Sequence, residues 1–234
     1  MTTHDIARIE RMEMYLKGVL TVAESAPPAT VSKVAEFMGV SAPSASEMLR
    51  RLEQQGYVRG ADDGFALTPS GLAKATKVVR RLRLAERLLT DVLKLDLPKV
   101  YDEACKMEHV ISDEVEARLA AVLGHPRTCP HGLPIPGEGG GLPVTRGLLD
   151  APLSQHLRVA SVPEEDAEML AYLADQGLLP GAEVVVDEIA PFNGPLTVVA
   201  SGVKRAIGRD VASRIRVIAG PEGPQRSLSP SFSP

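Results

Sequence analysis

The stretch DEACKMEHV at residues 102–110 carries three side chains that can bind a metal ion. Cys105, Glu108 and His109 stand at i, i+3 and i+4, so a helix would present all three on one face. A thiolate, a carboxylate and an imidazole form a large part of the coordination shell of a divalent transition metal. The alternative is a cysteine buried for packing beside a surface glutamate. A fourth ligand must come from elsewhere, and chemistry alone does not choose it.

A second cysteine and histidine, Cys129 and His131, stand in the motif CPHG. They lie in a turn rich in Pro and Gly, without further ligands nearby. A solitary pair of this kind is a weak signal for metal. We therefore expect Cys129 and His131 to lie outside the metal site.

The composition is that of an ordinary soluble protein. The chain has 234 residues, of which 44% are hydrophobic and 24% charged, and this length suggests one to three domains. We find no signal peptide and no apolar run long enough to span a membrane. Two distant cysteines fit free thiols in a reducing compartment, so we expect a cytoplasmic protein.

The formal net charge of −4 hides an asymmetry between two parts of the chain. Residues 72–94 contain seven Lys or Arg against two Asp or Glu, a local charge of +5. Residues 155–219 contain six against nine, a local charge of −3. This asymmetry indicates that one half of the protein meets a polyanion and the other does not.

Residues 1–72 have the pattern of a winged helix-turn-helix DNA-binding domain. The apolar spacing predicts a helix over 3–25, a short helix over 31–38, a corner at Gly39 and a second helix over 42–55. The dipeptide Asp63-Gly64 then predicts a β-hairpin, which would be the wing. The alternative is a helical bundle with a hairpin that has no function.

The start of the second helix in this motif supplies the candidates for DNA contact. The first residues of a recognition helix reach base edges in the major groove, and basic residues further along contact phosphates. The alternative reads the serines as a helix cap and solvent-facing residues. The candidates are Ser41, Pro43, Ser44, Ser46, Glu47, Arg50 and Arg51.

The rest of the chain divides into a helical and a β-rich part, so the fold class is mainly α with a small β-domain. Residues 73–137 predict a helical domain with a long basic helix over 70–95, a helix from Asp96 that carries the opening stretch, and a helix over 113–123. We expect a Pro/Gly-rich linker over 138–152, a small β-barrel with one short helix over 153–220, and a disordered tail over 221–234.

Four segments resemble one known family: MEMYL (12–16), RLAERLLTDV (83–92), LPKVYDEACKMEHVISDEVEARL (97–119) and GLPIPG (132–137). They are similar to the diphtheria toxin repressor family of metal-dependent transcriptional regulators, whose relatives include the iron-dependent and manganese transport regulators. The resemblance weakens after residue 137, where the chain still looks like that family's SH3-like, FeoA-type module. It implies a homodimeric repressor that binds operator DNA, not an enzyme, with residues 73–137 as its metal-binding and dimerisation domain.

The resemblance also implies a ligand set for the primary metal. The family takes a thioether from the first helix, here Met14, together with Cys105, Glu108 and His109. Met and Cys at these places resemble the iron branch, whereas the manganese branch carries carboxylates and has another where this chain has Lys17. We expect Fe(II) or Mn(II), with Co(II), Ni(II), Zn(II) or Cd(II) able to substitute in vitro.

The family's ancillary metal site is altered in this chain. Leu82 and Tyr101 stand where the family has histidines, although the matching carboxylate, Glu86, is present. Glu165 and Glu168 could complete a rebuilt second site with Glu86. The alternative makes Glu86 an ion-pair partner of a neighbouring arginine. Glu47 also stands where the family often has Gln, so the operator sequence is open.

These observations predict a repressor of iron or manganese uptake genes in which bound metal pins the first helix and favours binding to DNA. We expect the helices over 97–123 to form the dimer seam. One alternative is a redox-sensing transcription factor that uses Cys105 as a reactive thiol. Another is a metallohydrolase, which would leave the winged motif without a role.

Overall fold

The computed structural model describes residues 3–61, 63–138 and 143–220. The chain forms two compact units. The first comprises Met1–Lys94, Asp102–Arg127 and Ile135–Gly139, and the second comprises Leu95–Tyr101, Thr128–Pro134 and Gly140–Pro234. The tail predicted over 221–234 lies outside the described residues, as do residues 139–142 of the predicted linker.

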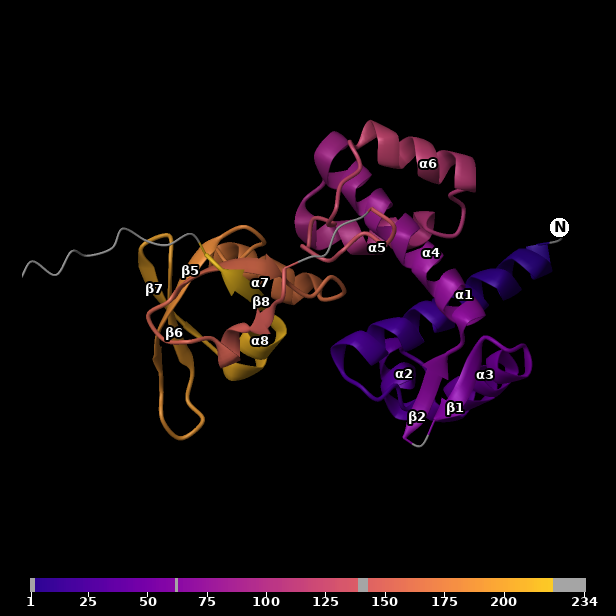
Figure 1. Ribbon diagram of the computed structural model, residues 1–234, viewed down its shortest axis with the longest axis horizontal. Helices are drawn as coiled ribbons and strands as arrows, with labels where there is room; N and C mark the ends of the chain where they lie inside the picture. The colour runs from indigo at the N-terminus through magenta and orange to yellow at the C-terminus, as the bar shows by residue number, and fades with distance from the viewer. Residues whose placement is uncertain (1–2, 62, 139–142, 221–234) are drawn as a thin grey trace, which may run out of the picture. The chain divides into compact units, whose positions relative to one another are not determined.

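The first unit begins with the predicted winged helix-turn-helix (Figure 1). Its elements are α1 (Thr3–Ser25), α2 (Val31–Phe37), α3 (Ala42–Gln54), β1 (Val58–Ala61) and β2 (Gly64–Leu67). The hydroxyls of Thr30 and Ser41 cap α2 and α3 by accepting from the backbone N–H three residues further on. The sequence therefore identified each of these helices to within one residue of its end.

The wing is held against the chain before α2. The Phe65 N–H donates to the Ala29 carbonyl at 2.9 Å, so a bridge extends the two-stranded sheet. A Cβ on Gly64 would lie 2.5 Å from the Ala29 oxygen, so only glycine fits here. Apolar side chains of α1, α2, α3, β1 and α4 form the core beneath the wing, among them Leu16, Val19, Val34, Leu49, Leu52, Val58 and Ala75.

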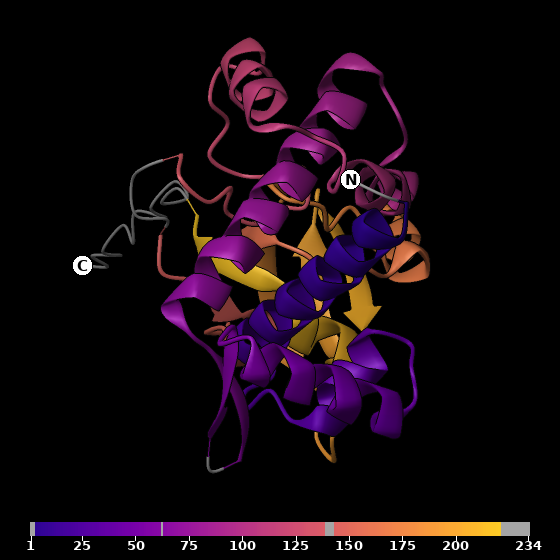
Figure 2. The same cartoon turned by 90° about the vertical axis from the view of Figure 1, so that its right-hand side faces the viewer.

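Three further helices complete the first unit: α4 (Pro69–Arg87), the first-unit part of α5 (Leu97–Met107) and α6 (Asp113–Val122). The packing of α1 against α4 can be followed in Figure 2. The prediction of one α-helix over 70–95 is wrong at its end. The α-helix stops at Arg87 and a π-helical turn covers Leu88–Val92, where the Thr90 hydroxyl donates to the Glu86 carbonyl at 3.0 Å.

The second unit contains a six-stranded antiparallel sheet with strand order β3-β8-β4-β5-β6-β7. It lies where a small β-barrel with one short helix was predicted, but two short helices accompany the sheet, α7 (Ala167–Asp175) and α8 (Arg209–Arg214). The strands are β3 (Arg146–Gly147), β4 (His156–Ser161), β5 (Glu183–Ile189), β6 (Leu196–Ala200), β7 (Val203–Ile207) and β8 (Arg216–Ala219). β3 and the 3₁₀ turn at Leu148–Asp150 lie within the segment expected to be a linker.

Strand alternation explains the core of the second unit. Leu196, Val198 and Ala200 of β6 are buried, while the residues between them are half-buried, because successive side chains point to opposite faces. Two irregular positions, one between β4 and β8 and one between β5 and β6, shift the register by one residue. In the described part of the chain, no helix is both long and apolar enough to cross a membrane.

Candidate functional site: two metal-ligand clusters and a DNA-binding helix

The opening stretch DEACKMEHV lies at the end of α5, not wholly within it. Cys105 is on the last turn of the helix, which ends at Met107, so Glu108 and His109 belong to the following turn. The prediction that one helical face carries all three is therefore wrong for the last two. The Glu108 N–H still donates to the Ala104 carbonyl at 3.0 Å, so Glu108 keeps its place one turn after Ala104.

A lysine stands among the predicted ligands in the first cluster, which comprises Lys17, Cys105, Glu108 and His109. The Lys17 Nζ lies 2.6 Å from Glu108 Oε1 and 3.7 Å from Cys105 Sγ. The side chain of Lys17 is only 2% exposed and that of Glu108 is fully buried, so water screens this ion pair little. Met14 precedes Lys17 by one turn of α1 and is half-buried.

His109 is held between two carboxylates. Its Nδ1 lies 2.7 Å from Glu13 Oε2, and its Nε2 lies 3.2 Å from Glu108 Oε1. Burial lowers the pKa of His109, but the carboxylates of Glu108 and Glu13 outweigh burial and raise the pKa from 6.5 to about 9. Without a metal ion, the imidazole is therefore mostly protonated at neutral pH.

The donor set of the first cluster fits a divalent metal. Glu108 Oε2 is buried and makes no hydrogen bond, and buried polar atoms normally have a partner. Thiolate, carboxylate and imidazole are ligands that Fe(II), Co(II) and Zn(II) accept. The Glu13–His109 contact is of the kind that orients a metal-bound imidazole. A positive charge, that of Lys17, already faces the carboxylate.

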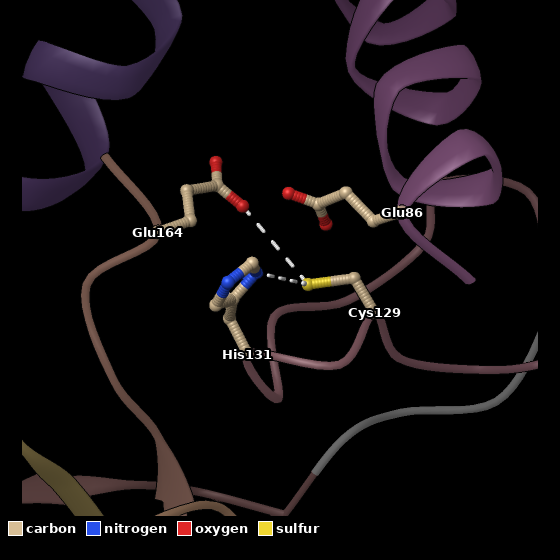
Figure 3. Close-up of side chains that lie close together, drawn as sticks. All are labelled: Glu86, Cys129, His131 and Glu164. Atoms are coloured by element: carbon tan, nitrogen blue, oxygen red, sulfur yellow. Dashed lines mark hydrogen bonds between the residues drawn. The ribbon is translucent and has the colours of Figure 1, made fainter. Parts of the chain in front are cut away.

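A second cluster lies in the second unit and comprises Cys129, His131 and Glu164 (Figure 3). Cys129 Sγ lies 3.8 Å from His131 Nδ1 and 4.0 Å from Glu164 Oε2. A tetrahedral site with bonds of about 2.0–2.3 Å separates its ligand atoms by about 3.3–3.8 Å, close to these distances. All three side chains are buried. The expectation that Cys129 and His131 have no further ligand nearby is therefore wrong, since Glu164 joins them.

The CPHG motif is placed by a tight turn against the end of β4. The Gly132 N–H donates to the Cys129 carbonyl at 2.9 Å, and the Val162 N–H donates to the His131 carbonyl at 3.0 Å. Gly132 has a φ of +84°, and a Cβ there would lie 1.9 Å from the Ala160 oxygen. The turn therefore lies directly against the strand that leads to Glu164.

The residues predicted for a second metal site have different environments. Glu165 and Glu168 are exposed, and their neighbour Glu164 is buried. Glu86, also labelled in Figure 3, is fully buried on α4 of the first unit, and Leu82 is buried in place of the family's histidine. Sequence reasoning missed Glu164. The only available signal was that it follows a strand by a few residues, in an acidic run.

The recognition helix α3 presents the predicted DNA-facing residues on one side. Ala45, Leu49 and Leu52 are buried against the core. Ser41 caps the helix, and its hydroxyl lies 2.9 Å from that of Ser44. Ser46 is half-buried, and the exposed candidates are Ser41, Pro43, Ser44, Glu47, Arg50 and Arg51. Glu47 forms an exposed ion pair with Arg51, one turn further along.

Much of the positive charge of α4 is neutralised within the first unit. Arg80 contacts Glu116 at 2.7 Å and also Glu138, while Lys77 and Arg81 contact Asp113. A hydrogen bond from Lys77, together with Arg81, lowers the pKa of Asp113. Part of the local charge of +5 is therefore used in packing against α6.

A winged helix with an exposed recognition helix, joined to metal-ligand clusters, defines a metal-dependent DNA-binding protein. The sequence matches three family models: the iron dependent repressor N-terminal DNA binding domain (residues 9–64), the iron dependent repressor metal binding and dimerisation domain (residues 68–137), and the FeoA domain (residues 146–219).

Similar proteins agree with these matches. The chain is 36% identical to the diphtheria toxin repressor of Corynebacterium diphtheriae, covering 89% of this chain and 97% of that protein. It is 34% identical to the iron-dependent repressor IdeR of Mycobacterium tuberculosis, with the same two coverages. A solved manganese-dependent transcriptional repressor in complex with manganese has a TM-score of 0.83 at 34% identity, covering 89% and 99% of the two chains.

The chain belongs to the iron-dependent repressor family. It is a DNA-binding transcriptional repressor with a domain for divalent metal and dimerisation, and the family is not one of enzymes. The predicted resemblance, the FeoA-type C-terminal domain, operator DNA as partner and homodimer formation are confirmed.

Proposed function

We propose that Fe(II) or Mn(II) activates this repressor, in the cytoplasm, to bind the operators of metal-uptake genes and shut them off when metal is plentiful. The observation that carries this proposal is the first cluster, where sulfur, carboxylate and imidazole donors gather beside the helix on which the DNA-binding motif packs. A divalent ion there would join two parts of the first unit, which gives metal binding a route to the DNA.

The proposed ligands of the first site are Met14, Cys105, Glu108 and His109. In support, Cys105 and Glu108 both contact the Lys17 ammonium, and Met14 is one turn away from Lys17 on α1. For a second site we propose Cys129, His131 and Glu164, supported by the distances between their ligand atoms. Glu86 is kept as a separate candidate because of its sequence match to the family, and not as a member of this cluster. Exposed Glu165 and Glu168 are the weaker candidates.

The identity of the metal is a proposal from ligand chemistry. Thioether and thiolate donors at Met14 and Cys105 favour Fe(II) over Mn(II), which prefers oxygen ligands. Solved relatives include one named as a complex with manganese and the repressor ScaR with bound Zn²⁺. Because these sites accept several divalent ions, availability in the cell would help to select the physiological one.

The proposed mechanism is a shift between two populations of the first unit. Met14 is on α1, which packs on both helices of the DNA-binding motif, α2 and α3. The other three ligands are at and just beyond the end of α5. An ion bound by both segments would hold α1 in one position and thereby favour one position of α3. Metal achieves this only to the extent that it binds the DNA-competent state more tightly.

The homodimer would place two copies of α3 against two operator half-sites about one DNA turn apart. For its seam we propose α6 and the turn before it. Val110, Val115 and Val122 are 73%, 47% and 77% exposed there, and a shallow apolar hollow is lined by Val115, Arg118, Leu119 and Val122. Such a contiguous apolar face is typical of an interface.

Operator binding in the presence and absence of metal tests the function. Operator fragments would be selected from random DNA with the metal-loaded protein, and binding measured by fluorescence anisotropy under anaerobic conditions with Fe(II), Mn(II) or chelator. We expect binding only with metal, and its loss in Cys105→Ala but not in the exposed control Lys106→Ala. Equal binding in chelator would refute metal activation. If binding persists in chelator but is lost with peroxide, the redox alternative holds.

The dimer seam has its own test. We expect Val122→Glu to shift the full-length protein from dimer to monomer in sedimentation experiments. Val144→Glu, at a position 96% exposed in the second unit, should leave the dimer intact. If Val122→Glu remains a dimer, α6 does not form the dimer interface.

A further inference from the structure

Lys17 is a buried cation that faces the ligands of the first metal site. Its ammonium is 2.6 Å from Glu108 Oε1 and 3.7 Å from Cys105 Sγ, and its side chain is 2% exposed. Buried lysine is rare, because removing an ammonium from water costs free energy unless an anion compensates. Its position among metal ligands therefore requires a reason.

The ammonium makes the contact that a bound metal ion would need. Glu108 Oε1 receives both Lys17 Nζ and, at 3.2 Å, the Nε2 of His109. The thiol of Cys105 lies 3.7 Å from the same Nζ, within hydrogen-bond range for sulfur. Two of the proposed ligands thus already contact one positive charge, and a third lies beside the same carboxylate oxygen.

A metal ion and this ammonium cannot both hold Glu108 in the same way. A ligand oxygen about 2.0–2.2 Å from a divalent ion leaves little room for Nζ at hydrogen-bond distance on the ion's side. A +1 and a +2 charge within a few ångströms in a buried site would also repel each other strongly. A metal ion bound to Glu108 Oε1 would therefore require Lys17 to move away.

We propose that Lys17 is the resident cation of the first site: its ammonium holds Glu108 and Cys105 in the metal-free protein, and a divalent metal binds by displacing it. This inference rests on the proposed function, since it assumes that these ligands bind metal. In this role, Lys17 sets the metal concentration at which the first site fills. Each binding event must first break a buried ion pair, so the apparent affinity is lower than the ligands alone would give.

The exchange also changes how α1 is held. In the metal-free state α1 is tied to Glu108 through Lys17, and in the metal-bound state through the ion and Met14, one turn earlier on the same helix. The same carboxylate therefore has two alternative partners on α1. A two-state contact of this kind is what a metal-driven population shift requires.

The alternative is that Lys17 only positions Glu108 and stays in place when metal binds. The two roles predict opposite effects of removing the charge. If Lys17 is displaced by metal, a neutral side chain removes a competitor and tightens metal binding. If Lys17 positions Glu108, a neutral side chain leaves the carboxylate misplaced and weakens metal binding.

Cobalt titration distinguishes them, because a thiolate–Co(II) charge-transfer band reports binding to sulfur. All proteins would be full length and carry Cys129→Ala, so that the band arises from Cys105, and Cys105→Ala would provide the blank. We expect Lys17→Met to bind Co(II) at least tenfold more tightly than the parent. Lys17→Arg, which keeps the charge, should bind no more tightly than the parent. If Lys17→Met does not fold in chelator, Lys17→Gln replaces it.

A measurement on the unmutated side chain complements the variants. Reductive methylation followed by peptide mass spectrometry should leave Lys17 protected in chelator and modified after Co(II) is added. Equal or weaker Co(II) binding by the neutral variants, or continued protection of Lys17 in Co(II), would overturn the inference while leaving the metal site intact. If no variant shows a cobalt–thiolate band, Cys105 does not bind the metal, and the proposed first metal site is itself refuted.

Discussion

The two clusters hold similar ligand types in different ways. In the first, Cys105, Glu108 and His109 lie within five residues, and a lysine from another helix compensates their carboxylate. In the second, Cys129 and His131 meet Glu164, which is 35 residues from Cys129 in the chain. The first cluster is maintained by an ion pair, and the second by a backbone turn against a strand. The first cluster could be recognised in the sequence because its residues are neighbours in the chain. The second could not, although its ligand atoms lie at distances close to those of a tetrahedral metal site.

The largest expected effect is at the ion pair. In chelator, Lys17→Met leaves Glu108 buried without its cation, and we expect a loss of about 3–5 kcal/mol in the free energy of unfolding, measured with urea. The control Lys106→Met removes an exposed ion pair with Glu103 and should leave stability essentially unchanged. A loss as small as the control's would mean that the first cluster does not depend on the ion pair.

The matching change at the second cluster is Gly132→Ala. The new Cβ meets the Ala160 oxygen and occupies a left-handed conformation, so we expect a destabilisation of about 3 kcal/mol. Gly124→Ala is the control, because its φ is similarly positive at +72° but nothing lies within 4 Å of the added Cβ. Its cost should be about 1 kcal/mol. Equal losses at the two glycines would show that close packing on β4 is unimportant.

Metal counting separates the clusters. We expect Cys129→Ala to lower the affinity for one of two bound Zn(II) ions by about 100-fold or more, and Cys105→Ala to lower the affinity for the other. Native mass spectrometry during a Zn(II) titration counts the bound ions. The double variant should retain neither ion. If both variants lose the same single ion, the two cysteines bind one metal ion and the prediction of two separate sites is wrong.

The smallest expected effect is a pH dependence confined to the first cluster. The pKa of His109 is raised to about 9 in the folded protein against 6.5 unfolded. The folded state therefore binds the proton more tightly, and this stabilisation is fully present below pH 6.5 and is lost as pH rises through about 9. We expect chelated protein to lose about 2 kcal/mol across this range.

His109→Gln should flatten that slope, and Glu13→Gln should reduce it, because Glu13 contributes to the raised pKa. Urea unfolding at a series of pH values measures both. An unchanged slope in His109→Gln would assign the pH dependence to other groups.

Much of the fold followed from local sequence patterns. The apolar spacing, the Ser41 cap, the Gly39 corner and the Asp63-Gly64 turn each specify a short-range structure, so the winged helix was predictable. The end of the α-helix at Arg87 was not predictable. A π-helical turn depends on which carbonyls accept the backbone hydrogen bonds of Leu88–Val92, and no local residue pattern specifies this. The short strands β3, β4 and β7 also lack the long β-branched runs that mark β5 and β6.

By itself, the sequence determined the class of protein and identified three candidate ligands of the first cluster, because residues close in the chain remain close after folding. Only the tertiary structure decided which side chains from distant segments join them. Lys17 reached Glu108 across 91 residues, and Glu164 reached Cys129 across 35. Contacts over such separations arise from how helices and strands pack, which no local pattern of residues contains. That is why Lys17 first looked like a missing ligand, whereas in the structure its ammonium contacts Glu108 and Cys105.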